Sequence, residues 1–380
     1  MGVKVSRKIE MVDLVSQYSR IKDEVDAAIN EVIQTARFIN GPAVKEFQTD
    51  LEKYLSIKHV IPCANGTDAL QIAMMALDLK QGDQVITSNF TFAATVETIA
   101  FLGLVPVLVD VYPDTFNINV KEIEKVITSK TKAIIPVHLF GQCADMEAIQ
   151  LLAKKHNLYV IEDTAQAIGA DYIFSNGTKK KAGTIGNIGT TSFFPSKNLG
   201  GYGDGGALCT NDDELAKKCR MIVNHGQSVQ YHYEILGVNS RLDSIQAAVL
   251  KVKLKYLDTY AAARNRAATY YDKAFAGNSK IKSPVRAKNS SHVFHQYTLA
   301  LYGVDRNKLK EHLASKEIPA MIYYPVPLHS QPAYRYPINE GRKYPITDKL
   351  CASVISLPIH TELDEETLKH ITDSVLEFTK

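Results

Sequence analysis

The segment AIIPVHLFGQCADMEAIQLLAKKHNLYVIED, residues 133–163, decides the fold. It places a helical pattern between two short apolar runs, Ala133–Leu139 and Tyr159–Glu162. Continuous apolar strands such as AIIPV are typical of a parallel sheet that is covered on both faces. Further apolar runs at Val85–Thr87 and Val105–Val111 also alternate with helical patterns. The spacing therefore predicts an α/β fold with a mostly parallel, doubly wound sheet.

The pattern changes in the second half of the chain. The strand-like pieces Thr190–Phe194 and Ala207–Thr210 flank a glycine-rich loop, and residues 244–275 predict one long helix. Frequent prolines and shorter elements follow, which indicates a smaller α+β domain. We therefore expect a large domain at residues 1–250, with an N-terminal helical arm, and a small C-terminal domain at residues 251–380.

Composition excludes several classes of protein. The 380 residues carry 44 Lys+Arg and 41 Asp+Glu, a net charge of only +3, so we expect no nucleic-acid partner. No apolar run reaches the roughly 18 residues that a membrane span needs, and the N-terminus lacks the apolar core of a signal peptide. We therefore expect a cytoplasmic protein without a membrane partner.

Cysteine and histidine spacing predicts no metal site. The five cysteines are scattered, with no C-x-x-C pair, and no H-E-x-x-H occurs. The pair His292 and His295 is more simply interpreted as core or surface histidines than as metal ligands.

Two glycine motifs resemble phosphate-binding sites. Gly201, Gly203 and Gly206 form a G-x-G-x-x-G pattern, but a strand-like ALCT follows it where a dinucleotide site needs a helix. Gly66 and Thr67 open a predicted helix, whose free N–H groups favour an anion. Taken alone, this second motif is more simply interpreted as a plain helix cap.

A lysine and a carboxylate give the strongest chemical signal. Asp163 ends an apolar strand, where α/β sheets bind ligands, although a capping role is an alternative. Lys197 lies between an apolar strand and a glycine-rich turn; it is either a surface lysine or, if desolvated, a nucleophile that forms a Schiff base. Pyridoxal 5′-phosphate (PLP) needs such a lysine, a carboxylate at its ring nitrogen, a phosphate cradle and an aromatic ring face. Lys197, Asp163, the Gly66–Thr67 helix end with Ser192, and Phe92 match these needs in turn.

Longer motifs carry a family resemblance over nearly the whole chain. They are CANGTDAL (63–70), IEDTAQAIGA (161–170), SFFPSKNLGGYGDGGA (192–207), NHGQ (224–227), GVNSRLDSIQAA (237–248), YYPVPLH (323–329) and SLPIH (356–360). The chain resembles the sugar-nucleotide aminotransferases of the DegT/DnrJ/EryC1/StrS family, most closely those that aminate the 3-keto group of a UDP-N-acetylglucosamine-derived uronic acid. The resemblance implies a PLP enzyme of the aspartate-aminotransferase fold (fold type I), working as a homodimer with active sites shared between subunits.

The resemblance also implies roles for the cofactor residues. Lys197 matches the lysine that bonds to PLP, Asp163 the partner of the ring nitrogen, and Gln166 the neighbour of the phenolic oxygen. The phosphate contacts match Gly66, Thr67 and Ser192.

Further positions match residues of the ring and sugar sites. Phe92 falls where the family places a stacking ring, and Asn239 matches a phosphate contact from the other subunit. Arg241 matches a cross-subunit residue suited to a sugar carboxylate, while His225 and His329 lie in segments that line the sugar site.

The expected activity is transfer of an amino group from glutamate to the keto carbon, C3, of a nucleotide-linked sugar for a cell-surface polysaccharide. Some relatives have histidine in place of the lysine and dehydrate their substrates, so Lys197 favours transamination. The alternatives are amination of a dTDP-3- or 4-keto-6-deoxyhexose, and a catalytically silent regulatory protein of the same fold.

Overall fold

The computed structural model describes residues 8–380 of the chain. The expected absence of a signal peptide and the start of the predicted large domain concern residues 1–7 in part, and these lie outside the described residues. Among residues 8–380, no helix combines the length and apolar character needed to cross a bilayer.

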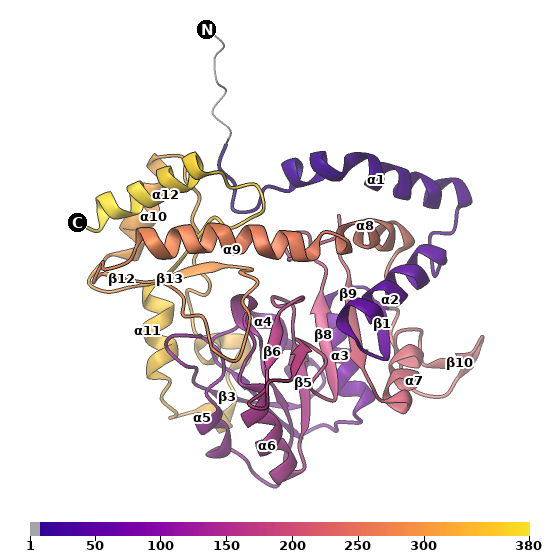
Figure 1. Cartoon of the computed structure of the whole chain (residues 1–380). Coiled ribbons are helices and arrows are strands. Elements are labelled where there is room, and N and C mark those ends of the chain that lie inside the picture. Colours follow the sequence, from indigo (N-terminus) through magenta and orange to yellow (C-terminus); the bar gives the residue numbers. More distant parts are fainter. Residues whose placement is uncertain (1–7) are drawn as a thin grey trace.

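A seven-stranded sheet forms the centre of the larger part of the molecule (Figure 1). Its strands pair in parallel, except that β9 runs antiparallel to both β1 and β8. The predicted α/β fold with a mostly parallel sheet is thereby confirmed. In spatial order the strands are β1 (His59–Cys63), β9 (Gly206–Thr210), β8 (Ile188–Ser192), β5 (Tyr159–Asp163), β4 (Thr131–Ile135), β2 (Gln84–Ser88) and β3 (Val105–Val109).

Helices cover both faces of this sheet, as the apolar strands require. One face packs against three helices: α3 (Gly66–Ala76), α4 (Ala93–Phe101) and α7 (Asp213–Ile222). The other face packs against four: α2 (Pro42–Leu55), α5 (Val120–Glu124), α6 (Met146–His156) and α8 (Ser244–Leu254). The N-terminal arm α1 (Leu14–Thr35) lies against α8.

Side-chain caps fix where several of these helices begin. Asn65 accepts a hydrogen bond from the Asp68 amide at the start of α3, and Asp212 caps α7 in the same way. Such caps satisfy amides of the first turn that have no partner inside the helix. In α3 the cap fixes the start of the helix just after the carboxyl end of β1.

The C-terminal part has its own small sheet and apolar core. The sheet has the order β12 (Ile281–Lys282), β13 (Tyr297–Leu301) and β14 (Val354–Leu357). Its core includes side chains of α9 (Leu257–Ala274), α10 (Arg306–Ser315) and α12 (Glu365–Phe378). The remaining elements are α11 (Pro345–Ser353), the hairpins β6 (Asp171–Ile173)–β7 (Lys179–Lys181) and β10 (Gln227–Val229)–β11 (His232–Tyr233), and 3₁₀ turns at Leu139–Gly141, Leu328–Ser330, Pro332–Tyr334 and Pro337–Asn339.

The prediction of one helix over residues 244–275 is wrong. The chain makes a tight turn at Lys255 and Tyr256, whose amides bond to carbonyls three residues back, and this turn separates α8 from α9. The turn lets Leu254 and Leu257 enter the same apolar cluster. The predicted domain boundary at residue 250 falls inside α8 and stays a prediction.

An asparagine from the C-terminal part covers the edge strand β3. The buried Asn339 side chain accepts from the Leu108 amide at 3.0 Å and donates to the Pro106 carbonyl at 2.9 Å. Edge strands otherwise expose unpaired backbone groups. Asn339 therefore completes the hydrogen bonding of this edge.

We expect Asn339→Ala to lower the free energy of unfolding by about 1–3 kcal/mol, because it leaves two backbone groups of β3 unsatisfied. Urea unfolding followed by circular dichroism measures the change. Asn307→Ala, at an exposed position of α10, serves as the matched control and should shift the midpoint little. Equal shifts for the two variants would contradict the role given to Asn339.

Candidate active site

The carboxyl-end edge of the central strands borders a cavity of about 540 Å³. Its walls come from the starts of α3 and α4, the end of β5, the loop after β8, and the C-terminal part. The lining residues are Asn65, Gly66, Thr67, Leu70, Thr91, Phe92, Ala94, Thr95, Val137, Phe140, Asp163, Ala165, Gln166, Ser192, Phe194, Ser196, Lys197, Asp204, His295, Gln296, Tyr323 and Tyr324. All the predicted cofactor residues except Asn239 are in this set.

Asp163 presents a buried carboxyl group at the end of β5. The Thr95 hydroxyl donates to its Oδ2 at 2.9 Å, and the Ala165 amide donates to its Oδ1 at 3.2 Å. Burial raises the pKa of Asp163, and these two donors together with the Lys197 amine only partly offset that effect. A buried carboxylate of this kind is stabilised by a protonated ring nitrogen placed opposite it.

Lys197 follows β8 and lines the same cavity. The residue is half-buried at the cavity wall. Burial lowers the pKa of Lys197 to about 8, with Asp163 acting in the opposite direction. An amine that loses its proton near neutral pH can act as a nucleophile or a base.

The start of α3 is pressed closely against the end of β8. A Cβ atom on Gly66 would lie 2.7 Å from the Cβ of Ser192, so only glycine fits there. The first-turn amides of α3 have no partner inside the helix, and the helix dipole favours an anion at this end. Gly66, Thr67 and Ser192 thus border one corner of the cavity whose electrostatics favour an anion.

Gln166 is held from both sides at the cavity wall. Its Oε1 accepts from the Phe140 amide at 2.8 Å, and its Nε2 donates to the Tyr324 hydroxyl at 3.1 Å. Tyr324 belongs to the C-terminal part, and burial raises its pKa. The Phe92 ring lies 6.3 Å from the Tyr324 ring, and Phe92 remains 57% exposed, as expected for an aromatic group with an open face.

The other predicted residues lie outside the cavity of their own chain. Asn239 is exposed and Arg241 is half-buried, just after the β10–β11 hairpin. His225 is exposed. His329 is half-buried, and its Nδ1 lies 2.8 Å from the side-chain Nδ2 of Asn89. The expectation that Asn239 and Arg241 serve the partner subunit's site stays a prediction.

Sequence reasoning missed three residues that shape the cavity. Thr95 lies one turn into a predicted helix, and Tyr324 lies within the YYPVPLH motif, yet no local pattern marks either as a site residue. His295 was interpreted as a core or surface histidine rather than as a metal ligand. It is buried and lines the cavity, and burial, with Lys197 and Arg264 nearby, lowers its pKa well below the usual value.

The residues present fit PLP. The cavity offers an amine for the aldehyde, a carboxyl group for the ring nitrogen and a glycine corner for the phosphate. Among the described residues, the buried Thr91 hydroxyl at the cavity wall has no hydrogen-bond partner. An orphaned polar group of this kind is expected where a ligand binds.

Comparisons with known proteins agree with this fit. The chain is 45% identical over 372 residues to the "Pleiotropic regulatory protein" of Geobacillus stearothermophilus, covering 97% of this chain and 98% of that one. It is also 45% identical over 363 residues to the UDP-2-acetamido-2-deoxy-3-oxo-D-glucuronate aminotransferase of Pseudomonas aeruginosa, covering 96% and 98%. The crystal structure of S. venezuelae DesV in complex with a ketimine intermediate superposes with a TM-score of 0.93, at 36% identity and 99% coverage of both chains.

The model of the DegT/DnrJ/EryC1/StrS aminotransferase family matches residues 19–376. Members of this family are PLP-dependent enzymes that aminate sugars. The matched residues include every residue that lines the cavity, among them Asp163, Lys197 and, from the C-terminal part, Tyr324. This chain therefore belongs to the DegT/DnrJ/EryC1/StrS aminotransferase family.

Proposed function

We propose that this enzyme transfers the amino group of glutamate to the C3 keto carbon of UDP-N-acetyl-3-oxo-glucuronic acid. The reaction takes place in the cytoplasm and supplies an amino sugar for a cell-surface polysaccharide. The observation that carries the proposal is the placement of the Lys197 amine and the Asp163 carboxyl group in one cavity. The choice of sugar is supported by the name of the Pseudomonas aeruginosa relative.

The cavity residues divide the binding of PLP among them. Gly66, Thr67 and Ser192 bind the phosphate, Phe92 covers one ring face, and Gln166 lies beside the phenolic oxygen. When bound, PLP supplies an electron-withdrawing ring that stabilises negative charge at the substrate carbon. Asp163 holds the proton at the ring nitrogen, which keeps the ring electron-poor.

Lys197 has two tasks in this proposal. It bonds to the cofactor at rest, and its free amine then moves a proton at the substrate carbon. Efficient proton transfer needs a group with a pKa near the working pH. Burial brings the pKa of Lys197 to about 8, which meets that need.

The partner subunit completes the site in this proposal. Asn239 reaches the partner's cofactor phosphate, and Arg241 pairs with the sugar carboxylate, with His225 and His329 bordering the sugar. Support comes from the β10–β11 region, which projects from the molecule (Figure 1) and exposes Tyr231 by 75% and Leu236 by 89%. Exposed apolar side chains that cluster in this way are typical of protein interfaces.

We expect the wild-type protein reconstituted with PLP to absorb visible light and to be bleached by glutamate. Lys197→Ala should abolish both the absorption band and transamination, because no other cavity residue supplies an amine. Absorption spectra before and after glutamate test this. Lys180→Ala, at an exposed position, is the matched control. A colourless wild-type protein would end the proposal and revive the silent regulatory alternative.

The Arg241 assignment predicts substrate selectivity. Arg241→Lys should raise KM for the uronate by about tenfold, since lysine cannot form the bidentate pair with a carboxylate. KM for a neutral 3-keto sugar nucleotide should change little. The exposed Arg266→Lys serves as the control. Equal effects on both sugars would refute the assignment, and faster turnover of a dTDP-keto-deoxyhexose would favour that alternative substrate.

Shared active sites predict complementation between inactive subunits. Lys197→Ala and Arg241→Ala homodimers should each be nearly inactive with the uronate. Random re-pairing of equal amounts gives half heterodimers, each with one intact site, so about a quarter of wild-type activity should return. Activity after mild dissociation and reassociation measures it. No recovery, with heterodimers verified by mass spectrometry, would place Arg241 in its own subunit's site.

A further inference from the structure

A second buried carboxylate lies next to Asp163 in the chain. Glu162 is fully buried, and its side chain contacts the fully buried ring of His138. Successive side chains of a strand point to opposite faces of the sheet. Asp163 therefore faces the cavity, while Glu162 points to the face that packs against α6. The proposed function assigns no task to Glu162 or His138.

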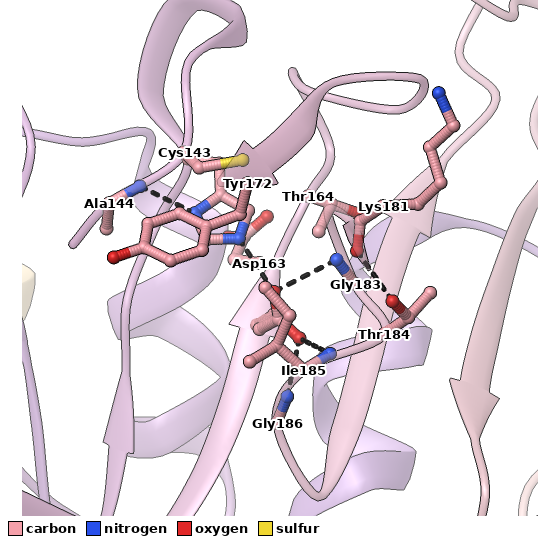
Figure 2. A network of polar contacts seen from close by, with 12 residues as sticks. Cys143, Ala144, Asp163, Thr164, Tyr172, Lys181, Gly183, Thr184, Ile185 and Gly186 are labelled. Carbon is pink, nitrogen blue, oxygen red and sulfur yellow. Dashed lines mark hydrogen bonds and ion pairs between the residues drawn. The ribbon is translucent and has the colours of Figure 1, made fainter. Parts of the chain in front are cut away.

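Four N–H groups converge on the Glu162 carboxylate. Its Oε1 accepts from the amides of Ile185 and Gly186, both at 2.6 Å. Its Oε2 accepts from the Gly183 amide at 3.0 Å and from His138 Nε2 at 2.9 Å. Figure 2 labels Gly183, Ile185 and Gly186, which lie in one turn and direct their amides to the same acceptor group.

The hydrogen bonds also fix the ring orientation of His138 and the charge of Glu162. His138 Nδ1 accepts from the Ala144 amide at 3.1 Å, so Nε2 is the ring nitrogen that donates to Glu162. Burial alone raises the pKa of Glu162, but the bonds from His138, Gly186 and Gly183 bring it below its usual value. Glu162 is thus an anion at neutral pH, held by four donors.

The turn at residues 183–186 can approach β5 only because it contains glycines. Gly183 adopts φ +86°, and a Cβ on Gly186 would lie 2.6 Å from the Val160 carbonyl oxygen. The turn leads directly into β8, which ends at Ser192 and continues to Lys197. Glu162 therefore ties the segment that carries Lys197 to the strand that carries Asp163.

His138 links the same carboxylate to the backbone of Asp163. The His138 amide donates to the Asp163 carbonyl at 3.0 Å, while its ring donates to Glu162. Two residues later, the Phe140 amide holds Gln166. His138 is therefore hydrogen-bonded to both Glu162 and Asp163 of β5. The segments that carry Asp163, Lys197 and the Phe140 amide are all linked to the buried Glu162 carboxylate, directly or through His138.

We propose that Glu162 and His138 are a positioning pair that fixes the Asp163 carboxyl group against the pyridine nitrogen of PLP and so sets the affinity for the cofactor. The proposal rests on the role given to Asp163 above.

Glu162→Gln tests the pair with an almost unchanged shape. The variant has one acceptor oxygen, and its NH₂ group must face either the turn amides or His138 Nε2–H. We expect the PLP dissociation constant, from absorbance titration of the apoenzyme, to rise by about tenfold. Glu147→Gln, which alters a surface carboxylate that also accepts from a backbone amide and a hydroxyl, is the matched control. An unchanged constant in Glu162→Gln would overturn the proposal.

A double-mutant cycle distinguishes an effect that acts through Asp163 from a general loss of structure in the variant. If the pair acts through Asp163, adding Glu162→Gln to Asp163→Asn should raise the dissociation constant further by less than about threefold. A second readout is the 1-deaza analogue of pyridoxal phosphate, which has carbon in place of the ring nitrogen. Its affinity should fall far less in Glu162→Gln than that of PLP. Equal losses for both ligands, or full additivity in the cycle, would show a merely structural role.

Substitutions of His138 test the pair even if the Glu162→Gln variant does not fold. His138→Leu removes one donor and should weaken PLP binding selectively over the deaza analogue, whereas His138→Gln, which restores an N–H donor, should recover most of the affinity. Equal affinities in these two variants would contradict the pair. An Asp163→Asn variant that binds PLP as tightly as wild type would instead refute the proposed role of Asp163 itself.

Discussion

Asp163 is the last residue of β5, and its backbone is hydrogen-bonded to the segment that follows β4, so the direction of its side chain depends on the parallel pairing of β4, β5 and β8. Parallel strands end at the same edge of a sheet, and the chain after each of them must turn there. In this chain the three turns carry Gln166, Lys197 and the Phe140 amide. The antiparallel strand β9 then packs beside β8, with the glycine-rich loop between them. The chemistry of the cavity is thus a consequence of strand order.

Local sequence was sufficient for the part of the site that follows from such turns. Asp163 ends an apolar strand, Lys197 precedes a glycine-rich loop, and Gly66 opens a helix, so each is marked by its own neighbours. The chemical needs of PLP extended the prediction to Ser192 and Phe92, and the family resemblance added Gln166; all three line the cavity. The strand bounds differed by a few residues, since apolar runs such as Ala133–Leu139 continue past Ile135, the last residue of β4.

The rest of the site depends on contacts between distant segments. Tyr324 meets Gln166 across 158 residues, and nothing in either segment alone indicates the pairing. The break between α8 and α9 likewise reflects the burial of Leu254 and Leu257 in one cluster. The sequence around His295 shows no special pattern, but its environment is unusual. Burial, together with the nearby cations of Lys197 and Arg264, lowers the pKa of His295 and keeps its ring neutral. Arg264 itself is held by the carbonyls of Phe294 and Ile359, which joins α9 to the C-terminal part.

The bond between Gln166 and Tyr324 has a consequence for how the protein is made. As the chain leaves the ribosome, Asp163 and Lys197 emerge long before residue 324, so the nascent sheet forms with one wall of its cavity absent. Domains synthesised first fold first. The closing wall arrives only when most of the chain has been translated, so the cavity is completed near the end of synthesis.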